Sequence, residues 1–317
     1  MRKLAAMTTV AAALCAASAL LPAAEPPRVV VSIAPLHSLV TGVMSRVGTP
    51  ELMVRGYGSP HSYQLRPSDA VKLTDADLVF WIGEALESFL AKPIAALARR
   101  ARIVELIRTD GLILLPSRSG GVWETPADVS HAQDHRKPGV HAHGHGELDP
   151  HIWLDAGNAK LIVREIVRQL VSVDPANATS YEVNGKTLQR RIDEMDGQFM
   201  RRLAPVRQVP YVVFHDAYQY LEHRYGLNVM GSVAAAPDRM PSARRLQTLR
   251  KEIRQRGVRC VFREPQFASA LVETILEDTS ARASVLDPLG TQFTPGPQAY
   301  FEMMNTNVTE LVDCLSS

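Results

Sequence analysis

The chain has 317 residues, 46% of them hydrophobic, and a formal net charge of +2 from 35 basic and 33 acidic residues. This near balance argues against nucleic acid as a partner, because binding to phosphates requires an excess of basic residues. Without an N-terminal segment of 24 residues, about 290 residues remain, enough for one large domain or two of ~100–150 residues.

The N-terminal segment 1–24 has the three-part pattern of a secretory signal. Arg2 and Lys3 precede an apolar run over about residues 4–21, and small residues lead to a cleavage site near Ala24. A transmembrane anchor is the weaker alternative, because the run is rich in Ala and Thr and barely reaches the ~20 apolar residues of a membrane span. We therefore expect an exported protein that loses this signal, has no net charge and does not insert into a membrane.

Short apolar runs alternate with helical patterns through the first half of the mature chain. The predicted strands cover residues 28–33, 52–54, 78–82, 102–106 and 152–154. The predicted helices cover residues 36–46, 67–74 and 156–170. The second half repeats the alternation, with strands over residues 211–214, 228–233, 258–262 and 283–286 and helices over residues 219–225, 244–256 and 271–281. Strand–helix–strand alternation implies parallel pairing and sheets covered by helices.

The strongest helical pattern lies between the two halves. Asp174 can cap this helix, Pro175 occupies its first position, and Pro205 ends it. Its apolar residues recur at steps of three or four and form one face: Leu188, Ile192, Met195, Phe199 and Leu203. About 30 residues at 1.5 Å each make a rod of roughly 45 Å, long enough to cross two domains.

The predicted fold is therefore α/β, with two Rossmann-like lobes, each a parallel sheet flanked by helices, joined by one long rigid linker helix. The N-terminal lobe is expected over residues 25–173, the linker helix over residues 174–205, and the C-terminal lobe over residues 206–317.

The cysteines that remain after signal removal are Cys260 and Cys314. An even pair in an exported protein indicates a disulfide. A metal site built on cysteine is the alternative, but neither residue has a Cys or His neighbour at the spacing of such sites.

Five of the ten histidines crowd the segment over residues 118–148, which lacks hydrophobic periodicity and is expected to be a solvated loop. They are His131, His135, His141, His143 and His145. Imidazole is a common ligand for zinc. Because ordering such a loop around a metal costs conformational entropy at every residue, we expect a secondary site of low affinity there.

Three other histidines stand at the ends of predicted strands: His61, His151 and His215. Ligands of open α/β sheets collect at the carboxyl ends of strands. Each histidine alone could be a core or capping residue, but three in equivalent positions across two lobes favour a shared metal site. His37 and His223 fall inside helical patterns and are interpreted as structural or exposed.

Nearby carboxylates are expected to have supporting roles. Asp69 could orient the His61 ring. Asp155 is expected to cap the helix over residues 156–170, and Asp216 stands at a helix start.

Four blocks of this sequence resemble the signatures of a known family: Ser59–Asp69, Asp149–Asp155, Phe214–Tyr218 and Glu264–Phe267. They are similar, in the same order, to those of the metal-binding substrate-binding proteins of ABC importers, in the periplasmic high-affinity zinc-uptake branch. The resemblance covers nearly all of the mature chain. The His-rich loop before Asp149 and the Cys260–Cys314 pair match further marks of that branch.

The resemblance implies that a metal lies in the cleft between the lobes, bound by His61, His151 and His215. Some zinc-branch members have a Glu before the first of these histidines, but Pro60 stands there in this chain. Other members of the family use an Asp that matches Asp287. We therefore expect Asp287 or a water to complete a four-coordinate site.

Three neutral imidazoles with at most one carboxylate suit zinc, whereas a pair of carboxylates would indicate manganese. The resemblance implies that the protein, a periplasmic monomer, captures Zn²⁺ and delivers it to an inner-membrane ABC permease and its ATPase. A manganese- or iron-binding homologue, an adhesin and a periplasmic zinc buffer are alternatives.

A zinc hydrolase is a further alternative, since three histidines and a water also form a catalytic arrangement. The sequence has no His-Glu-x-x-His or Gly-x-Ser-x-Gly motif, so we do not expect an enzyme.

Overall fold

The computed structural model of this chain describes residues 25–118, 148–234, 241–267 and 270–316. The expected signal over residues 1–24 lies outside the described residues, as do the five histidines of the His-rich loop.

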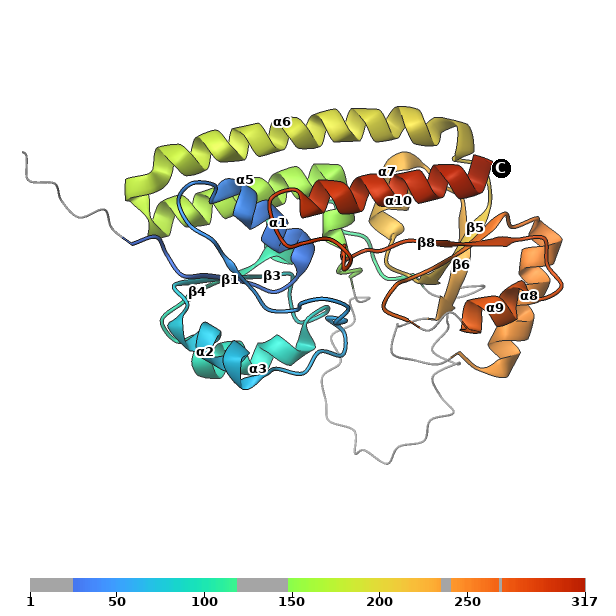
Figure 1. The fold of residues 1–317 in the computed structure, drawn as a ribbon, viewed down its shortest axis with the longest axis horizontal. Coiled ribbons are helices and arrows are strands. Elements are labelled where there is room, and N and C mark those ends of the chain that lie inside the picture. The colour runs from blue at the N-terminus through green and yellow to red at the C-terminus, as the bar shows by residue number, and fades with distance from the viewer. Residues whose placement is uncertain (1–24, 119–147, 235–240, 268–269, 317) are drawn as a thin grey trace, which may run out of the picture.

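Two parallel four-stranded sheets form the centres of the two lobes, as predicted (Figure 1). The N-terminal sheet has the order β2-β1-β3-β4, from β1 (Val29–Val31), β2 (Glu51–Leu52), β3 (Leu78–Trp81) and β4 (Arg102–Glu105). The C-terminal sheet has the order β6-β5-β7-β8, from β5 (Tyr211–His215), β6 (Val229–Ala234), β7 (Cys260–Arg263) and β8 (Arg282–Val285). Within each sheet the strands pair in parallel, so their carboxyl ends lie at the same edge. Loops that bind a ligand usually gather at this edge.

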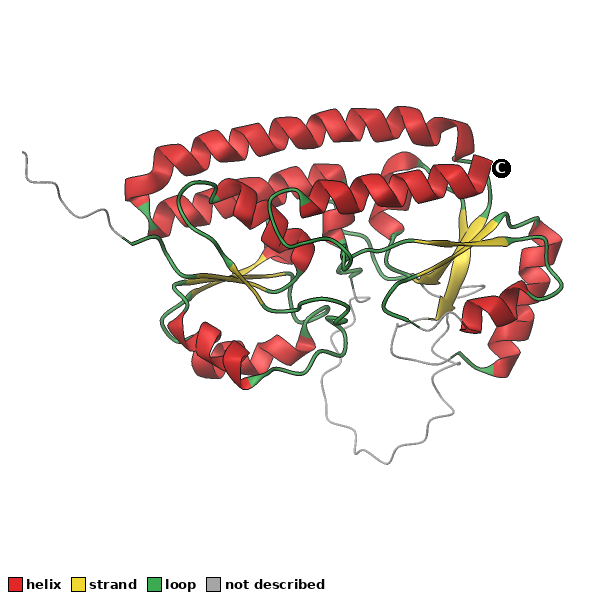
Figure 2. Ribbon diagram, in the orientation of Figure 1, coloured by secondary structure: helices red, strands yellow, loops and turns green. Residues whose placement is uncertain are grey.

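Helices cover both faces of each sheet (Figure 2). In the N-terminal lobe, α2 (Pro67–Asp75) and α3 (Ser88–Leu97) lie on one face, opposite α1 (Ala34–Val43) and α5 (Ala156–Val173). In the C-terminal lobe, α8 (Ala243–Arg256) and α9 (Ala270–Leu276) cover one face, and α7 (Gln219–Tyr225) and α10 (Ala299–Ser316) lie toward the other.

The linker is α6 (Ala178–Leu203), which runs over both lobes (Figure 1). Short 3₁₀ turns precede and follow it, at Pro175–Asn177 and Ala204–Val206. Its buried face includes the predicted apolar series from Leu188 to Leu203.

The segment Ile152–Leu154 is a 3₁₀ turn, so its prediction as a strand was wrong. A short apolar run has no periodicity that distinguishes a strand from another buried segment. All three residues are fully buried, and the turn leads directly into α5. Asp155 caps that helix as expected, because its Oδ1 accepts the backbone N–H of Asn158 at 2.9 Å.

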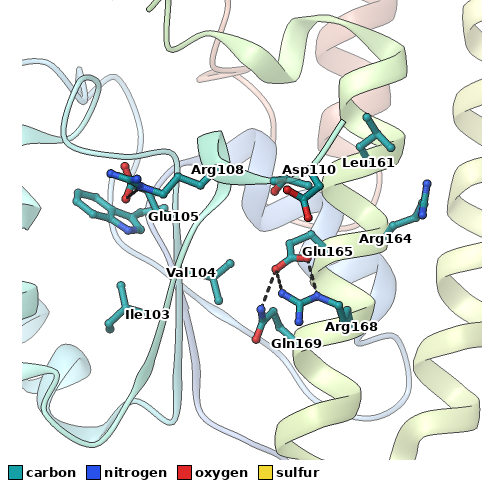
Figure 3. Close-up of a pocket in the computed structure, with 12 residues that line it drawn as sticks. Ile103, Val104, Glu105, Arg108, Asp110, Leu161, Arg164, Glu165, Arg168 and Gln169 are labelled. Atoms are coloured by element: carbon teal, nitrogen blue, oxygen red, sulfur yellow. Dashed lines mark hydrogen bonds and ion pairs between the residues drawn. The ribbon is translucent and has the colours of Figure 1, made fainter. Parts of the chain in front are cut away.

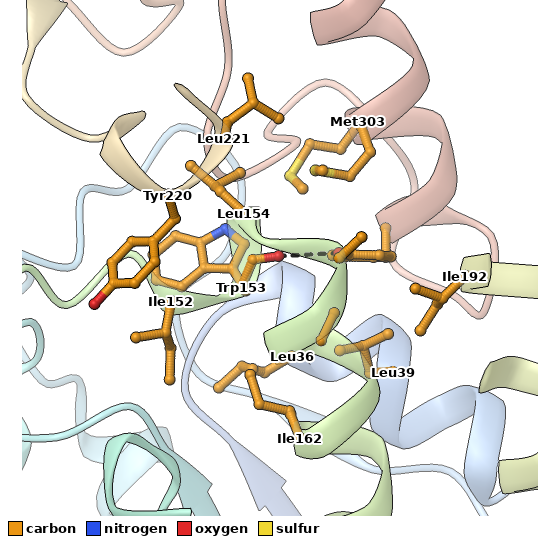
Figure 4. Packing of buried hydrophobic residues seen from close by; sticks show 14 of the residues in the cluster. Leu36, Leu39, Ile152, Trp153, Leu154, Ile162, Ile192, Tyr220, Leu221 and Met303 are labelled. Carbon is orange, nitrogen blue, oxygen red and sulfur yellow. Dashed lines mark hydrogen bonds between the residues drawn. The ribbon is translucent and has the colours of Figure 1, made fainter. Parts of the chain in front are cut away.

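One hydrophobic core continues through both lobes (Figure 4). It joins Leu36 of α1, Ile192 of α6 and Met303 of α10 around Trp153. The indole Nε1 of Trp153 donates to the carbonyl oxygen of Pro288 at 2.8 Å, and its own carbonyl oxygen accepts the hydroxyl of Tyr300 at 2.9 Å. Because N-terminal and C-terminal segments share this core, packing as well as the linker helix fixes the position of the lobes.

The predicted disulfide is present between Cys260 and Cys314, with a Cα–Cα distance of 6.2 Å. It joins the first residue of β7 to α10.

Candidate metal centre

The structure brings His61, His151 and His215 together between the lobes. Each offers one nitrogen, and these nitrogens all lie within 4.8 Å of one another. The Nε2 atoms of His151 and His215 are 3.5 Å apart. A single cation of the size of zinc, which binds imidazole nitrogen at about 2.0–2.1 Å, fits between such atoms.

His61 lies on the loop that follows β2. The loop turns at Gly56, which has a φ of 61°, a conformation that favours glycine. The backbone N–H of His61 donates to Ser59 Oγ at 3.3 Å. Asp69 fixes the loop rather than the imidazole, because its Oδ2 accepts the hydroxyl of Tyr63 at 2.9 Å and the N–H of Arg66 at 3.1 Å.

His151 is oriented by a carboxylate two residues before it. Its Nδ1 lies 2.7 Å from Asp149 Oδ1, and its backbone N–H donates to the same oxygen at 3.0 Å. Because an ionised carboxylate only accepts hydrogen bonds, Nδ1 carries the proton and Nε2 keeps its lone pair for a metal. The carbonyl oxygen of Asp149 accepts the hydroxyl of Tyr220 at 2.9 Å, which fixes this segment against α7.

His215, the last residue of β5, is oriented in the same way by Glu264, which follows β7. Glu264 is 1% exposed and its Oε1 hydrogen-bonds His215 Nδ1. Carboxylate partners of this kind fix the tautomer of a metal-binding histidine and raise its basicity. The sequence reasoning assigned no role to Glu264, since 49 residues separate it from its partner.

The pKa values of His61 and His215 are shifted in opposite directions. Burial, together with the nearby His151 and His215, lowers the pKa of His61 to about 2, so this ring is neutral and ready to bind. Burial is the largest influence on His215 and lowers its pKa, but Glu264, with smaller contributions from Asp216 and Asp149, more than offsets it, so the pKa lies above the ordinary value.

Asp287, which was expected to be the fourth ligand unless a water took that place, is not part of this cluster. Its Oδ1 accepts the N–H groups of Leu289 and Gly290, both at 3.0 Å, and Gln266 Nε2 at 3.1 Å. Its Oδ2 accepts the backbone N–H and the hydroxyl of Thr291, at 2.6 and 2.8 Å. Five hydrogen bonds thus occupy this carboxylate, four from its own loop and one from Gln266.

Apolar side chains form the walls of the small cavity around the three imidazoles. Leu86, Trp153, Phe267 and Leu289 line it together with the histidines. Such walls exclude large ligands and bulk solvent, and they strengthen electrostatic interactions inside the cavity.

The remaining histidines of the described residues lie apart from the cluster. His37 is buried in α1 with Nε2 at 3.0 Å from the carbonyl oxygen of Pro50, a structural role, and His223 is exposed on α7.

A separate, larger groove lies beside β4 and α5 (Figure 3). Four of its charged side chains pair with one another: Glu165 accepts Arg168 Nε at 2.8 Å, and Arg108 Nε donates to Glu105 at 2.5 Å. We therefore assign no ligand to this groove.

Within the described residues, no helix has the length and apolar character needed to cross a membrane.

Comparison with known proteins identifies the family. The family model for the periplasmic zinc-uptake complex component A, ZnuA, matches residues 29–314. The high-affinity zinc uptake system protein ZnuA of Brucella suis biovar 1 (strain 1330) is 39% identical over 311 residues, which cover 93% of each chain.

Solved structures support the fold alone, because their sequences are distant. A crystal structure of ZnuA has a TM-score of 0.74 at 20% identity, covering 92% of this chain and 99% of that one. A Mn-bound periplasmic metal binding protein from Candidatus Liberibacter asiaticus has a TM-score of 0.73 at 21% identity, covering 91% and 99%. The extent of the family match and the identity to the Brucella protein show that this chain belongs to the ZnuA family of periplasmic zinc-uptake components.

Proposed function

We propose that the protein captures Zn²⁺ in the periplasm through His61, His151 and His215 and passes it to an inner-membrane ABC permease and its ATPase. The observation that carries this proposal is the buried cluster of three imidazoles whose nitrogens lie within 4.8 Å of one another. In this proposal the protein acts as a monomer, since each ligand comes from the same chain.

Zinc fits this donor set better than manganese. Imidazole nitrogen suits zinc, whereas manganese favours carboxylate and carbonyl oxygens. The carboxylate of Asp287 is held by its own loop, so we propose that a water, rather than Asp287, is the fourth ligand. The manganese- or iron-binding homologue therefore remains the weaker candidate.

Binding without catalysis is the better interpretation of the cavity. Asp216, the possible general base beside His215, is engaged by Arg118, whose Nε donates to its Oδ2 at 3.0 Å. Both carboxylate oxygens of Asp216 are thus engaged by the Arg118 guanidinium and do not face the imidazoles as a free base would. We therefore propose a binding protein rather than a zinc hydrolase.

Calorimetric titration with zinc, in competition with a chelator, tests the cleft site. We expect one tightly bound zinc, and His61→Ala, His151→Ala and His215→Ala should each weaken it by orders of magnitude. His223→Ala, on the exposed side of α7, is the control and should bind as the wild type does. Full zinc affinity in the triple variant would overturn the assignment, and equal affinity for manganese would favour the alternative homologue.

We also propose a second, weaker zinc site formed by the five histidines of the His-rich loop, which lie outside the described residues. Deletion of residues 131–147 should remove the weaker zinc and leave the cleft zinc in place. Calorimetry on the deletion variant decides this point, since loss of the tight zinc would place the primary site in the loop.

A further inference from the structure

The amide of Gln266 connects the metal cavity to Asp287. Gln266 lines the cavity of the three imidazoles, and its Nε2 donates to Asp287 Oδ1 at 3.1 Å. A carboxylate offers only acceptors, so the nitrogen of the amide faces Asp287 and the orientation of the amide is fixed. The other end, Oε1, is buried and has no hydrogen-bond partner among the described residues. A buried amide oxygen of this kind calls for a hydrogen-bond donor from a ligand of the cavity.

The charges around the cluster define which fourth ligand suits it. Asp149 and Glu264 each hydrogen-bond one imidazole, so two carboxylates face the two positive charges of a zinc ion. A neutral fourth ligand leaves the zinc charge matched by the carboxylates of Asp149 and Glu264. An anion would add a further negative charge beside them and beside the buried Asp287. Water is neutral, and it donates the hydrogen bond that an amide oxygen accepts.

We propose that Gln266 Oε1 accepts a hydrogen bond from the water that is the fourth ligand of bound zinc, and so reserves that position for water against anions. This inference rests on the proposed zinc site. Asp287, through its bond to Nε2, positions the amide, and the lone pairs of Oε1 repel a negatively charged ligand at the same position.

Two variants distinguish the loss of Gln266 Oε1 from the loss of a hydrogen bond to Asp287. Gln266→Leu and Thr291→Val each remove one hydrogen bond to Asp287, but only the first removes an oxygen from the cavity. The protein loaded with Co²⁺ in place of zinc has a visible spectrum that reports its ligands, and azide serves as the anionic probe.

We expect Gln266→Leu to lower zinc affinity ~10–100-fold, the usual effect of losing an outer hydrogen-bond partner of a metal site. In the Co²⁺-loaded form the same variant should bind azide more tightly than the wild type, with a changed visible spectrum. Thr291→Val should resemble the wild type in both measurements. If Gln266→Leu does not fold, judged by circular dichroism, Gln266→Met provides the same comparison with an unbranched side chain.

Equal azide affinity and identical spectra for the wild type and the Gln266 variant would overturn the inference, as would equal effects of both variants. Either result would leave the zinc site intact. Failure of the wild type to bind one zinc tightly would instead contradict the proposed function.

Discussion

Glu264 and Asp149 make His215 and His151 competent metal ligands, because each fixes the proton on Nδ1 and directs Nε2 into the cavity. Within the described residues no carboxylate hydrogen-bonds the ring of His61, whose neutrality follows from burial and its two imidazole neighbours. Each lobe thus contributes one ligand that a carboxylate orients, His151 or His215, and the N-terminal lobe also contributes His61, which depends on its loop.

Replacing Glu264 by Gln should change how zinc binding depends on pH. A protonated imidazole cannot bind a metal, so affinity falls as the pH drops through the pKa of His215, which Glu264 raises above the ordinary value near 6.5. Glu264→Gln keeps an acceptor oxygen but removes the charge. We expect zinc affinity at neutral and higher pH to fall ~10–100-fold, and its decline on acidification to move to lower pH.

Chelator competition over a series of pH values measures both effects. Glu273→Gln, an exposed position on α9, is the matched control. An unchanged pH profile in the Glu264 variant would show that this carboxylate does not govern the protonation of His215.

The histidines of the site could be predicted from sequence because each stands at a junction between an apolar run and a loop. Asp149 is close enough to His151 in sequence for such a pattern to include it. Glu264 could not be paired with His215 in this way, since only the parallel pairing of β5 with β7 brings them together. The hydrogen bonds that hold Asp287 could not be predicted either, because they depend on the backbone geometry of its loop rather than on the spacing of residues in the sequence.

At the scale of elements, the contact between α5 and α6 is unusually close at Gly185. A Cβ atom at this position would lie 2.4 Å from Val167 Cγ2, which belongs to α5. Gly197, on the same helix, has only the flexible end of Arg201 at 3.7 Å from such an atom. The two glycines therefore allow a matched comparison between a crowded and an open position of one helix.

Gly185→Ala should destabilise the protein by about 1–3 kcal/mol through overpacking, although alanine is the better helix former. Gly197→Ala should stabilise it by about 0.5–1 kcal/mol, because alanine has the higher helix propensity and its Cβ meets no clash at this position. Val167→Ala should recover part of the loss when combined with Gly185→Ala. Urea denaturation of the four proteins measures these differences, and a stabilising Gly185→Ala would contradict the close contact.

A regular apolar face made α6 predictable, whereas other elements gave weaker signals. The expected cap by Asp174 was wrong, because α6 begins at Ala178 after a 3₁₀ turn and the Asp174 carboxylate instead accepts the hydroxyl of Tyr181. The sequence reasoning did not predict α3 or α10, and it extended α9 to residue 281 where the structure ends it at Leu276. Helix α3 contains Pro93 in its interior, and a proline in the sequence normally indicates the end of a helix. Whether such a segment forms a helix depends on tertiary packing, because burial of its apolar face offsets an unfavourable intrinsic helix propensity.

At the scale of the whole molecule, the site lies between lobes that share a core and a long helix. Trp153 hydrogen-bonds a carbonyl group after β8 and accepts the hydroxyl of Tyr300 from α10. Movement of one lobe against the other would break these buried contacts.

The disulfide should stabilise this arrangement without taking part in metal binding. Cys260 begins β7, and Glu264 follows the other end of that strand, so the sulfur atoms and the imidazoles lie toward opposite ends of the sheet. In the chain-entropy model, a bond that closes a loop of 54 residues contributes about 4 kcal/mol. The double variant Cys260→Ala, Cys314→Ala should therefore unfold at a lower urea concentration, while its zinc affinity below the transition stays that of the wild type. Loss of zinc from a variant that circular dichroism shows to be folded would mean that α10 and β7 control the position of Glu264 through this bond.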